Sequence, residues 1–410
     1  AMAVREKIAV VGGGAAGQMA AIMAARRGLA VTLFEKNEKL GKKLYITGKG
    51  RCNVTNDCSR EDFFENIIEN PRFLYSAYTA FDQRAVMELI EQAGTPLKVE
   101  RGQRVFPVSD KSSDVLAALE RAGREAGVQV RLYTQIKSVL TENGEAVGLV
   151  TREGEHLFFD KVILATGGVS YPSTGSTGEG LLMAQETGHT VTKLYPSLVP
   201  LETVESWPFA LSGLTLKNVS LTVEKEGKVL CRELGEMLLT HFGVSGPLVL
   251  TASAYLAGRA EGARLYIDFK PGLTAEQLDK RLVRDLGENP RKTLEGALTG
   301  LLPGRLLEAV LKAAGLEGQM TASNLTRAQR QKLGSLLKAM PLTVKRARGF
   351  NEAVVTRGGI SVREVSPSTM ESKRIRGLFF AGEMLDVDGF TGGFNLQIAW
   401  STGALAGQSV

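Results

Sequence analysis

The sequence predicts an α/β fold in which both ends of the chain build one Rossmann-like domain around an inserted module. Three observations predict it. Residues 6–36 follow the order β-rich run, glycine turn, helical run, second β-rich run. Residues 377–407 begin with a short apolar strand, followed by a glycine-rich turn and a helical run. Residues 196–270 instead contain consecutive β-rich segments with no helices expected between them, which indicates an antiparallel barrel or sandwich.

Composition narrows the class of protein. A chain of 410 residues is too long for one ordinary core, so two or three domains are expected. The 50 basic and 44 acidic side chains leave a formal charge of +6, and the basic residues do not form a sustained block. A small-molecule substrate is therefore expected, and a nucleic-acid partner is not.

Cysteine content and hydropathy indicate the compartment. Three cysteines cannot form a disulfide framework, so a reducing, cytoplasmic location is expected. No apolar run has the length needed to cross a bilayer, and no membrane partner is expected. Gly12 to Gly14 interrupt the apolar N-terminal stretch, which argues against a signal peptide. The oligomeric state stays open.

The patterning between these regions predicts the remaining elements. Residues 60–125 predict mostly amphipathic helices, and residues 128–168 alternate as a small β-meander does. Residues 274–341 are mainly amphipathic helix, and a β-like stretch follows. The expected domains are an FAD-binding domain (1–194 and 363–410), a β-barrel module (195–272, with a return strand at 341–362) and a helical insert (273–340).

The glycine turn matches the dinucleotide-binding pattern G-x-G-x-x-G. Gly12 permits a tight turn, Gly14 lets the backbone approach a diphosphate, and Gly17 lets the helix pack closely on the strand. Glu35 ends the second strand, where its carboxylate can accept hydrogen bonds from ribose hydroxyls. An acid there disfavours a 2′-phosphate. The pattern and its context predict a dinucleotide site.

The C-terminal segment distinguishes FAD from NAD. The strand Gly377-Leu-Phe-Phe-Ala-Gly-Glu383 leads into DGFTGGFNLQIAW, which places Gly392 and Gly393 at the start of a helix. This resembles the second FAD-contact motif of the flavoproteins with two dinucleotide-binding domains. A helix N-terminus there would stabilise negative charge on a reduced flavin. Ala165-Thr-Gly-Gly168 resembles the middle motif of the same group.

The full chain resembles one family. ITGKGRCNVTN, ATGGVSYPSTGSTGEG, LTHFGVSGP and the long C-terminal motif are similar to the BaiN-like family of bacterial NAD(P)/FAD-dependent oxidoreductases. The resemblance covers essentially the whole length. It implies a flavin domain from both chain ends that carries a β-barrel module with a helical insert. It also implies an activity on dehydro bile-acid (steroid enone) intermediates or on aminoacetone.

The resemblance also implies the residues that contact FAD. Ala15 and Ala16 would contact the diphosphate, Glu35 and Lys36 the adenosine ribose, and Ile136 the adenine. The remaining expected contacts, several of them near the flavin, are Gly12, Gly14, Gly17, Lys42, Gly50, Arg51, Cys52, Asn53, Thr166, Gly167, Gly382, Glu383, Gly392, Gly393, Phe394, Asn395, Leu396 and Gln397.

The two cysteines of ITGKGRCNVTNDC raise the alternative of a redox disulfide. Dithiol flavoprotein reductases carry C-x4-C on a helix, whereas Cys52 and Cys58 are spaced C-x5-C across turn-forming residues. Those enzymes also carry a second nucleotide fingerprint, and Gly175-Ser-Thr-Gly178-Glu-Gly180 has the wrong spacing for one. We therefore interpret the stretch as a loop beside the cofactor.

The sequence offers three candidates for catalytic residues. Tyr171 as a proton donor, His241 and Arg51 are candidates; Tyr171 has a structural alternative as a packed aromatic, and His241 has one as a hydrogen-bonded structural histidine. His156 and His189 are expected in surface turns. No His, Cys or acidic pair has metal-ligand spacing, so no metal site is expected.

Three functions stay open from the sequence. The first is an FAD oxidoreductase that passes hydride from NAD(P)H through flavin N5 to an organic acceptor, such as a conjugated ketone. The second is a flavin oxidase of a small amine that uses oxygen. The third is a non-catalytic FAD-binding regulator or RNA-modification partner, for which the basic segment Lys345-Arg-Ala-Arg348 is the only support.

Overall fold

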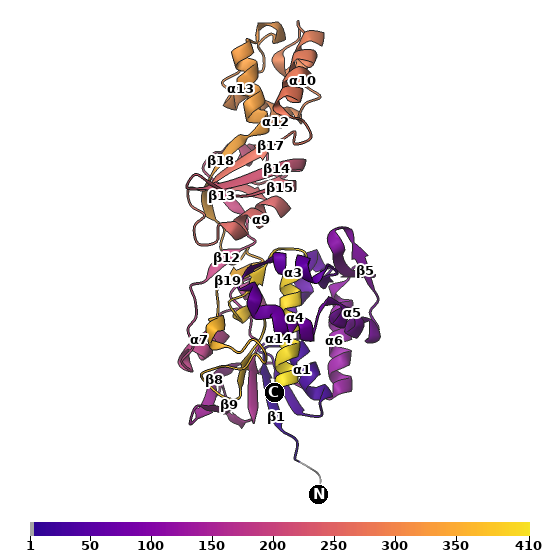
Figure 1. Ribbon diagram of the computed structural model, residues 1–410, viewed down its shortest axis with the longest axis vertical. Helices are drawn as coiled ribbons and strands as arrows, with labels where there is room; N and C mark the ends of the chain where they lie inside the picture. The colour runs from indigo at the N-terminus through magenta and orange to yellow at the C-terminus, as the bar shows by residue number, and fades with distance from the viewer. Residues whose placement is uncertain (1–3) are drawn as a thin grey trace. The chain divides into compact units, whose positions relative to one another are not determined.

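The computed structural model describes residues 4–410, which form two compact units. The first unit comprises the chain up to Pro196 together with Phe350–Val410, and the second comprises Ser197–Gly349. The two ends of the chain therefore share one unit, as the colours of Figure 1 show. The predicted fold class, a Rossmann-like unit with an inserted antiparallel barrel, is confirmed.

The first unit is organised around a five-stranded sheet with the order β20-β11-β1-β2-β7, in which all neighbouring strands are parallel. The strands are β1 (Lys7–Val11), β2 (Ala30–Phe34), β7 (Gln129–Arg131), β11 (Lys161–Leu164) and β20 (Leu378–Phe380). Because β20 pairs with β11, the C-terminal segment completes a sheet that the N-terminal segment begins.

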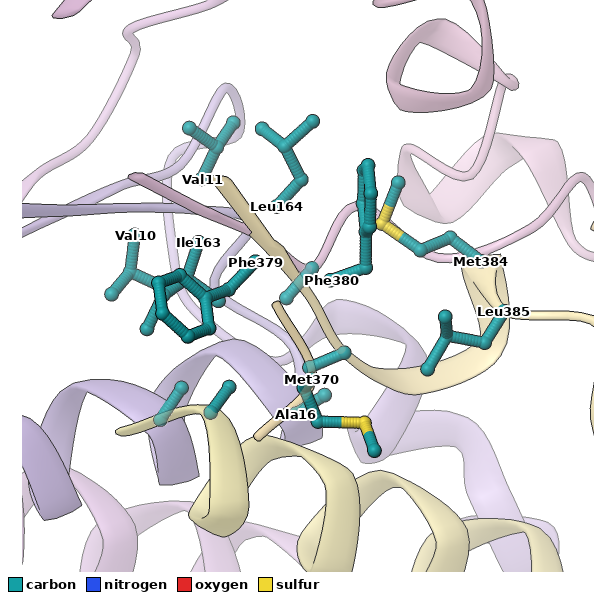
Figure 2. Packing of buried hydrophobic residues seen from close by; sticks show 14 of the residues in the cluster. Val10, Val11, Ala16, Ile163, Leu164, Met370, Phe379, Phe380, Met384 and Leu385 are labelled. Carbon is teal, nitrogen blue, oxygen red and sulfur yellow. The ribbon is translucent and has the colours of Figure 1, made fainter. Parts of the chain in front are cut away.

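Both faces of the central strands are buried, as is usual for a parallel sheet. Val162, Ile163 and Leu164 of β11 are fully buried. Figure 2 shows Val10, Ile163 and Phe379 from three adjacent strands gathered on one side of the sheet. These strands therefore form the rigid base from which the glycine turns extend.

Two helices of the first unit pack against each other along their length. They are α1 (Ala15–Arg26) and α14 (Phe394–Ser409), which Figure 1 shows side by side. A Cβ at Gly403 would lie 2.4 Å from the carbonyl oxygen of Ala16, so the two backbones touch. The other helices are α2 (Lys42–Ile46), α3 (Arg60–Glu65), α4 (Tyr75–Ala80), α5 (Gln83–Gln92), α6 (Ser112–Ala126) and α7 (Glu179–Glu186).

Smaller sheets complete the first unit. The predicted meander is antiparallel and consists of β8 (Ile136–Glu142), β9 (Glu145–Thr151) and β10 (His156–Phe158). The expectation of mostly helix over residues 60–125 was incomplete, because three short strands also lie there. They and their partners are β3 (Thr55–Asn56), β4 (Ile67–Glu69), β5 (Leu97–Glu100), β6 (Arg104–Pro107) and β21 (Asp388–Gly389).

The second unit is a closed antiparallel barrel with the strand order β13-β16-β15-β14-β17-β18. Its strands are β13 (Leu201–Thr203), β14 (Thr215–Lys225), β15 (Lys228–Leu239), β16 (Gly243–Ser245), β17 (Arg264–Asp268) and β18 (Met340–Ala347). A short two-stranded pair, β12 (Tyr195–Ser197) and β19 (Val355–Arg357), lies where the chain enters and leaves this unit.

Two helices contradict the expectation that no helix lies between the β-rich segments. They are α8 (Trp207–Ala210) and α9 (Pro247–Tyr255). Pro247 occupies the first turn of α9, where its missing N–H costs nothing. The run of Leu and Val that looked like a strand is helical because it packs on β15.

The helical insert lies between β17 and β18 (Figure 1). Its helices are α10 (Ala275–Glu288), α11 (Leu294–Ala297), α12 (Gly304–Ala313) and α13 (Arg327–Lys338). Thr274 with Gln277, and Thr326 with Gln329, form capping boxes that fix where α10 and α13 begin. Across the described residues, 4–410, we find no helix that is both long enough and apolar enough to cross a membrane.

Candidate functional site

The glycine turn after β1 packs against protein atoms at Gly12 and Gly17 and faces open space at Gly14. A Cβ at Gly12 would lie 2.2 Å from the carbonyl oxygen of Ala165, and one at Gly17 would lie 1.6 Å from the carbonyl oxygen of Gly12. A Cβ at Gly14 would meet no atom of the described chain within 4 Å. Gly14 is also the N-cap of α1 and has no side chain with which to cap it. Open space at a positive helix N-terminus fits a diphosphate.

Glu35 is held beside this turn at the end of β2. Its Oε1 accepts a hydrogen bond from the Gly13 N–H at 3.1 Å, and its Oε2 accepts one from the Asn37 N–H at 2.9 Å. Thr134 N–H donates to the Glu35 carbonyl at 3.0 Å, which brings the start of β8 and the buried Ile136 to the same edge. The predicted diphosphate, ribose and adenine contacts therefore lie close together.

Lys36 and Lys42, two further predicted FAD contacts, are each paired with a carboxylate. The Nζ of Lys36 pairs with Glu179 Oε2 at 3.1 Å, and the Nζ of Lys42 pairs with Glu38 Oε1 at 2.8 Å. Lys42 is therefore engaged by an exposed carboxylate four residues earlier in the chain. Its neighbour Lys43 instead reaches the carboxylate of Glu383, which was itself a predicted FAD contact.

The segment after β20 meets the fingerprint helix. Gly382 has a φ of 80°, and a Cβ there would lie 2.7 Å from the Cβ of Ala16. Glu383 accepts a hydrogen bond from the Thr356 N–H at 2.8 Å in addition to its ion pair with Lys43. Sequence patterns did not single out Lys43 or Thr356, since each is defined only by contact with a distant segment.

The middle motif lies against the same segment. Thr166 Oγ1 donates to the sulfur of Met384 at 3.7 Å, and Gly167 has a φ of 81°. Val169 N–H donates to Thr356 Oγ1 at 3.0 Å. Thr356 therefore connects the middle motif with Glu383, so three motifs that are far apart in the sequence converge.

The N-terminus of α14 is fixed by the loop that contains the two cysteines. A Cβ at Gly393 would lie 2.4 Å from the carbonyl of Thr55, and Asn56 Nδ2 donates to the Gly392 carbonyl at 3.0 Å. In the orientation that satisfies its amide, Asn53 accepts from the Gly393 N–H at 3.0 Å. The loop therefore positions the helix N-terminus.

The side chains of the first α14 turn face the protein interior. Gln397 Oε1 accepts from Thr55 Oγ1 at 2.6 Å, and Asn395 Nδ2 donates to the Gly389 carbonyl at 2.9 Å. Phe394 is buried and Leu396 is partly buried. A ligand at this end of α14 would therefore meet backbone N–H groups rather than these side chains.

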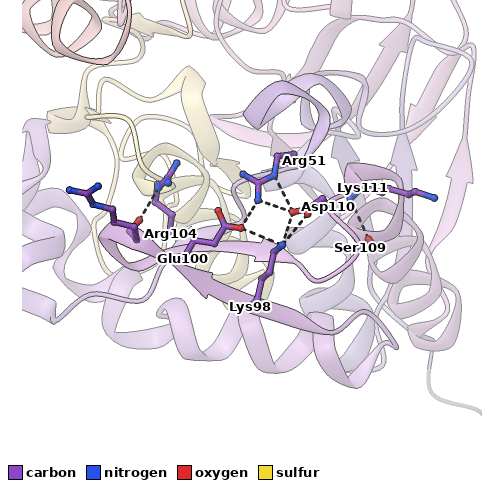
Figure 3. Close-up of polar contacts among 8 residues, drawn as sticks. Arg51, Lys98, Glu100, Arg104, Ser109, Asp110 and Lys111 are labelled. Carbon is purple, nitrogen blue, oxygen red and sulfur yellow. Dashed lines mark hydrogen bonds and ion pairs between the residues drawn. The ribbon is translucent and has the colours of Figure 1, made fainter. Parts of the chain in front are cut away.

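Arg51 is engaged by carboxylates of its own chain. Its guanidinium binds Glu100 Oε2 at 2.5 Å and Asp110 Oδ1 at 2.7 Å, and Lys98 shares both acids, as Figure 3 shows. Its Cζ also lies 3.9 Å from the centroid of the Phe106 ring. Hydrogen bonds from Arg51 and Lys98 lower the pKa of Glu100 and Asp110, so the cluster stays ionised. The structure therefore shows Arg51 paired with carboxylates, and its role in catalysis stays a prediction.

The cysteines are free thiols with little nucleophilic character. Cys52 is fully buried, and burial raises its pKa to about 12, whereas burial raises the pKa of Cys58 to about 11. A thiol attacks as its thiolate, so neither is activated at neutral pH. Gly50, two residues before Cys52, has a φ of 84°, and a Cβ there would meet no atom of the described chain within 4 Å.

Tyr171 and His241 occupy different settings. Tyr171 lies in the first unit in the left-handed region, with φ 49°, and its N–H donates to the Phe350 carbonyl at 3.2 Å. Burial raises the pKa of Tyr171, so its hydroxyl stays protonated at neutral pH. His241 is exposed in the second unit, edge-on to Phe242. The phenol of Tyr171 therefore carries a proton, and both residues stay predictions as proton donors.

His189 was wrongly expected in a surface turn. It is 5% exposed, its Nε2 lies 2.6 Å from Ser372 Oγ, and its Nδ1 lies 3.0 Å from the Ala184 carbonyl. His156 is exposed at the start of β10. Within residues 4–410, no group of three or more His, Cys, Asp or Glu side chains is placed to hold a metal ion.

Comparison with known proteins identifies the family. The HI0933-like protein Rossmann domain matches residues 6–409. The chain belongs to this family. A 3-dehydro-bile acid delta(4,6)-reductase of Clostridium scindens is 36% identical over 98% of both chains. A ribosomal RNA dihydrouridine synthase of Haemophilus influenzae is 30% identical over 96% of this chain and 95% of that protein.

A solved structure shows the same fold. The 3-ketosteroid delta1-dehydrogenase of Sterolibacterium denitrificans, in complex with 1,4-androstadiene-3,17-dione, superposes with a TM-score of 0.53 at 15% identity, covering 98% of this chain and 99% of that chain. The HI0933-like match confirms the assignment to the flavoprotein oxidoreductases. The protein is an FAD-dependent oxidoreductase.

Proposed function

We propose that this protein reduces a carbon–carbon double bond conjugated to a carbonyl, with NAD(P)H as electron donor and FAD as the tightly bound carrier. The open space at Gly14, which we call the cradle, is the observation that carries the proposal. It lies at the N-terminus of α1, beside Glu35 and in contact with the Gly382–Glu383 segment. This is one cradle for one dinucleotide. NAD(P)H would therefore use the cavity of the substrate, in alternation with it.

The names of the two full-length relatives support the class of reaction. One is a 3-dehydro-bile acid delta(4,6)-reductase and the other a ribosomal RNA dihydrouridine synthase. Both names denote the addition of hydrogen across a double bond conjugated to a carbonyl. A shared bond change in two relatives that span the chain favours this chemistry over oxidation of a small amine such as aminoacetone.

The residues of the site suit this reaction. Bound FAD would supply a ring that accepts and donates a hydride. The N–H groups at the start of α1 would hold its diphosphate, and Glu35 would accept hydrogen bonds from its ribose. The N-terminus of α14, held by Thr55 and Asn53, would stabilise negative charge on the reduced ring. Tyr171 would donate the proton that the acceptor needs.

An RNA uracil is the second candidate acceptor, and the charge distribution favours it. Residues 197–349 contain 21 of the 50 basic and 15 of the 44 acidic side chains. The second unit therefore carries the whole surplus of +6, and the first unit is formally neutral. A basic unit in the same chain as a neutral catalytic unit suits a polyanionic substrate. The conjugated ketone remains our first proposal, since the bile-acid relative has the higher identity.

The decisive experiment is an anaerobic visible spectrum of the FAD-loaded protein with added NADH, then NADPH. We expect the flavin band to bleach and to return when a steroid enone is added. Tyr171→Phe is expected to bleach at the wild-type rate and to reoxidise more slowly, because only the proton donor is lost. Reoxidation by a uridine-containing RNA and not by an enone would favour the second candidate. A flavin that stays oxidised with both nucleotides would refute the proposed donor.

A further inference from the structure

The β5–β6 hairpin of the first unit carries one charge cluster that is neutral and one that is positive. The neutral cluster contains two bases and two acids in contact, as Figure 3 shows: Arg51, Lys98, Glu100 and Asp110. The positive cluster consists of Arg101 and Arg104 at the hairpin turn and Lys49 in the loop beside it. All three residues are exposed, and none has a carboxylate within 4 Å in the described part of the chain.

One buried ring brings the two segments of the positive cluster together. A Cβ at Gly48, next to Lys49, would lie 3.7 Å from the Phe106 Cε1, and the Arg104 Cζ lies 5.5 Å from the centroid of the same ring. The Arg104 Nε also donates a hydrogen bond to the Arg101 carbonyl at 3.0 Å. Arg104 is therefore fixed by a ring and a carbonyl, and its terminal N–H groups have no acceptor among residues 4–410.

The positive cluster keeps an excess of charge and has open space around it. Asp57 is an acid beside the turn, because its N–H donates to the Gln103 carbonyl at 2.8 Å. Its carboxylate forms no ion pair within 4 Å among the described residues, so three bases face one acid. A Cβ at Gly50 or at Gly102 would meet no described atom within 4 Å. An anionic ligand therefore has both charge and room on the two segments.

The hairpin turn is joined to the start of α14. The Nδ2 of Asn56 donates to the Gly102 carbonyl and to the Gly392 carbonyl, each at 3.0 Å. Gly393 is the N-cap of α14, where we propose that the flavin ring lies. The positive cluster therefore lies beside the proposed flavin site and within the same unit.

We propose that Lys49, Arg101 and Arg104 bind the phosphate groups of the nicotinamide nucleotide, an inference that rests on NAD(P)H as the proposed electron donor. Hydride transfer requires the nicotinamide ring to lie against the flavin, so the phosphates extend away from it. The glycine turn at residues 12–17 is assigned to FAD, and the second nucleotide needs other phosphate ligands. Arginine suits this role because its guanidinium donates two parallel hydrogen bonds to a phosphate.

The test is calorimetric titration of the FAD-loaded protein with NADP⁺ and, separately, with NAD⁺, neither of which reduces the flavin. We expect Arg101→Gln/Arg104→Gln to bind NADP⁺ at least about tenfold more weakly than the wild-type protein. Its FAD content and its thermal melting should be unchanged. Arg101→Lys/Arg104→Lys keeps the charge and should lose less affinity than the glutamine variant.

Arg124→Gln/Arg363→Gln is the matched control. Both arginines are exposed and have no carboxylate within 4 Å among residues 4–410. Arg124 lies in the last turn of α6, whereas the hairpin precedes the first turn of this helix. The control should bind NADP⁺ as the wild-type protein does. In a second measurement, flavin bleaching by NADPH, the glutamine variant should need more NADPH and reach the wild-type limiting rate.

Equal losses for NADP⁺ and NAD⁺ would place the diphosphate at the positive cluster, and a loss for NADP⁺ alone would place the 2′-phosphate there. Three outcomes would overturn the proposal. They are no saturable binding of either nucleotide by the wild-type protein up to about 1 mM, unchanged binding by a folded glutamine variant, and an equal loss in the lysine variant or the control. Cluster-dependent binding with a flavin that NADPH leaves oxidised would support this site and refute the proposed donor.

Discussion

At the scale of single residues, Gly14 differs from the glycines around it because a side chain there would meet space rather than protein. Its φ of −81° also suits any residue, whereas Gly12 has a φ of 107°. Gly14→Val should therefore fold normally and obstruct the diphosphate. We expect FAD affinity to fall by at least about a hundredfold, roughly 2.7 kcal/mol, in a fluorescence titration of the apoprotein.

Gly304→Val is the matched control for this substitution. Gly304 begins α12 in the second unit, and a Cβ there meets no described atom within 4 Å. This variant should bind FAD as the wild-type protein does. Normal FAD affinity in Gly14→Val would show that the diphosphate does not lie at this turn.

A second prediction at this scale concerns the contribution of His189 to the pH dependence of folding stability. Burial lowers its pKa from the usual value near 6.5, and Glu364 and Arg374 are the charged groups that influence it. As the pH falls below about 6.5, the unfolded chain takes up a proton that the native His189 resists, so stability is lost. At higher pH this penalty vanishes.

His189→Gln should remove this dependence. We expect the free energy of unfolding from urea titrations to fall less between pH 7 and pH 5 in the variant than in the wild-type protein. The profile of the variant must be compared with that of the wild-type protein. Burial raises the pKa of Asp388 to about 6 in both proteins, and this raised pKa increases stability as the pH falls over the same range. Parallel pH profiles for the two proteins would contradict the assignment.

At the scale of elements, the α1–α14 pair depends on small residues where the backbones touch. Gly403 lies against the Ala16 carbonyl, and a Cβ at Gly407 would lie 2.3 Å from the Ala20 carbonyl. The contact orients both helices, whose N-termini we propose contact the cofactor. Overpacking here should therefore affect both stability and FAD binding.

Gly403→Ala should lower the free energy of unfolding by about 1–3 kcal/mol, since a Cβ 2.4 Å from a carbonyl oxygen forces the helices apart. Gly287→Ala in α10 is the control, and we expect it to raise the free energy of unfolding rather than lower it. A Cβ there meets no described atom within 4 Å, so the helix should gain about 0.5–1 kcal/mol. Urea unfolding followed by tryptophan fluorescence, to which Trp400 in α14 and Trp207 in α8 both contribute, checks the first variant, and circular dichroism checks the second. A neutral Gly403→Ala would show that the helices adjust at no cost.

At the scale of the whole molecule, the confinement of the net positive charge to residues 197–349 distinguishes the two candidate acceptors. If a conjugated ketone is the substrate, affinity for a uridine-rich single-stranded RNA should be weak and should disappear between about 50 and 200 mM salt. Fluorescence anisotropy with a labelled oligonucleotide measures this.

An RNA substrate would instead leave specific binding at the higher salt concentration. That binding would weaken when exposed basic side chains of the helical insert, such as Arg291, Lys292 and Arg327, are changed to glutamine. An Arg84→Gln/Lys137→Gln protein serves as control, since it removes two exposed basic side chains from the formally neutral first unit.

The sequence by itself was sufficient for the features that neighbouring residues encode. The fold class, the turn at Gly12–Gly17 and the helix after Gly393 follow from local periodicity and turn chemistry, and the structure shows each of them. The family assignment followed from motifs of the same kind and is confirmed. Of the candidate site, the cradle glycines and Glu35 could be named because their spacing defines them.

Only the tertiary structure decided which side chains are occupied by partners far away in the chain. Arg51 is held by Glu100 and Asp110, His189 is buried against Ser372, and Lys43 rather than Lys42 reaches Glu383. The strands over residues 60–125 and the helix α9 were missed for the same reason. An apolar run or a charge has one local pattern but several possible environments, and packing with distant segments selects among them.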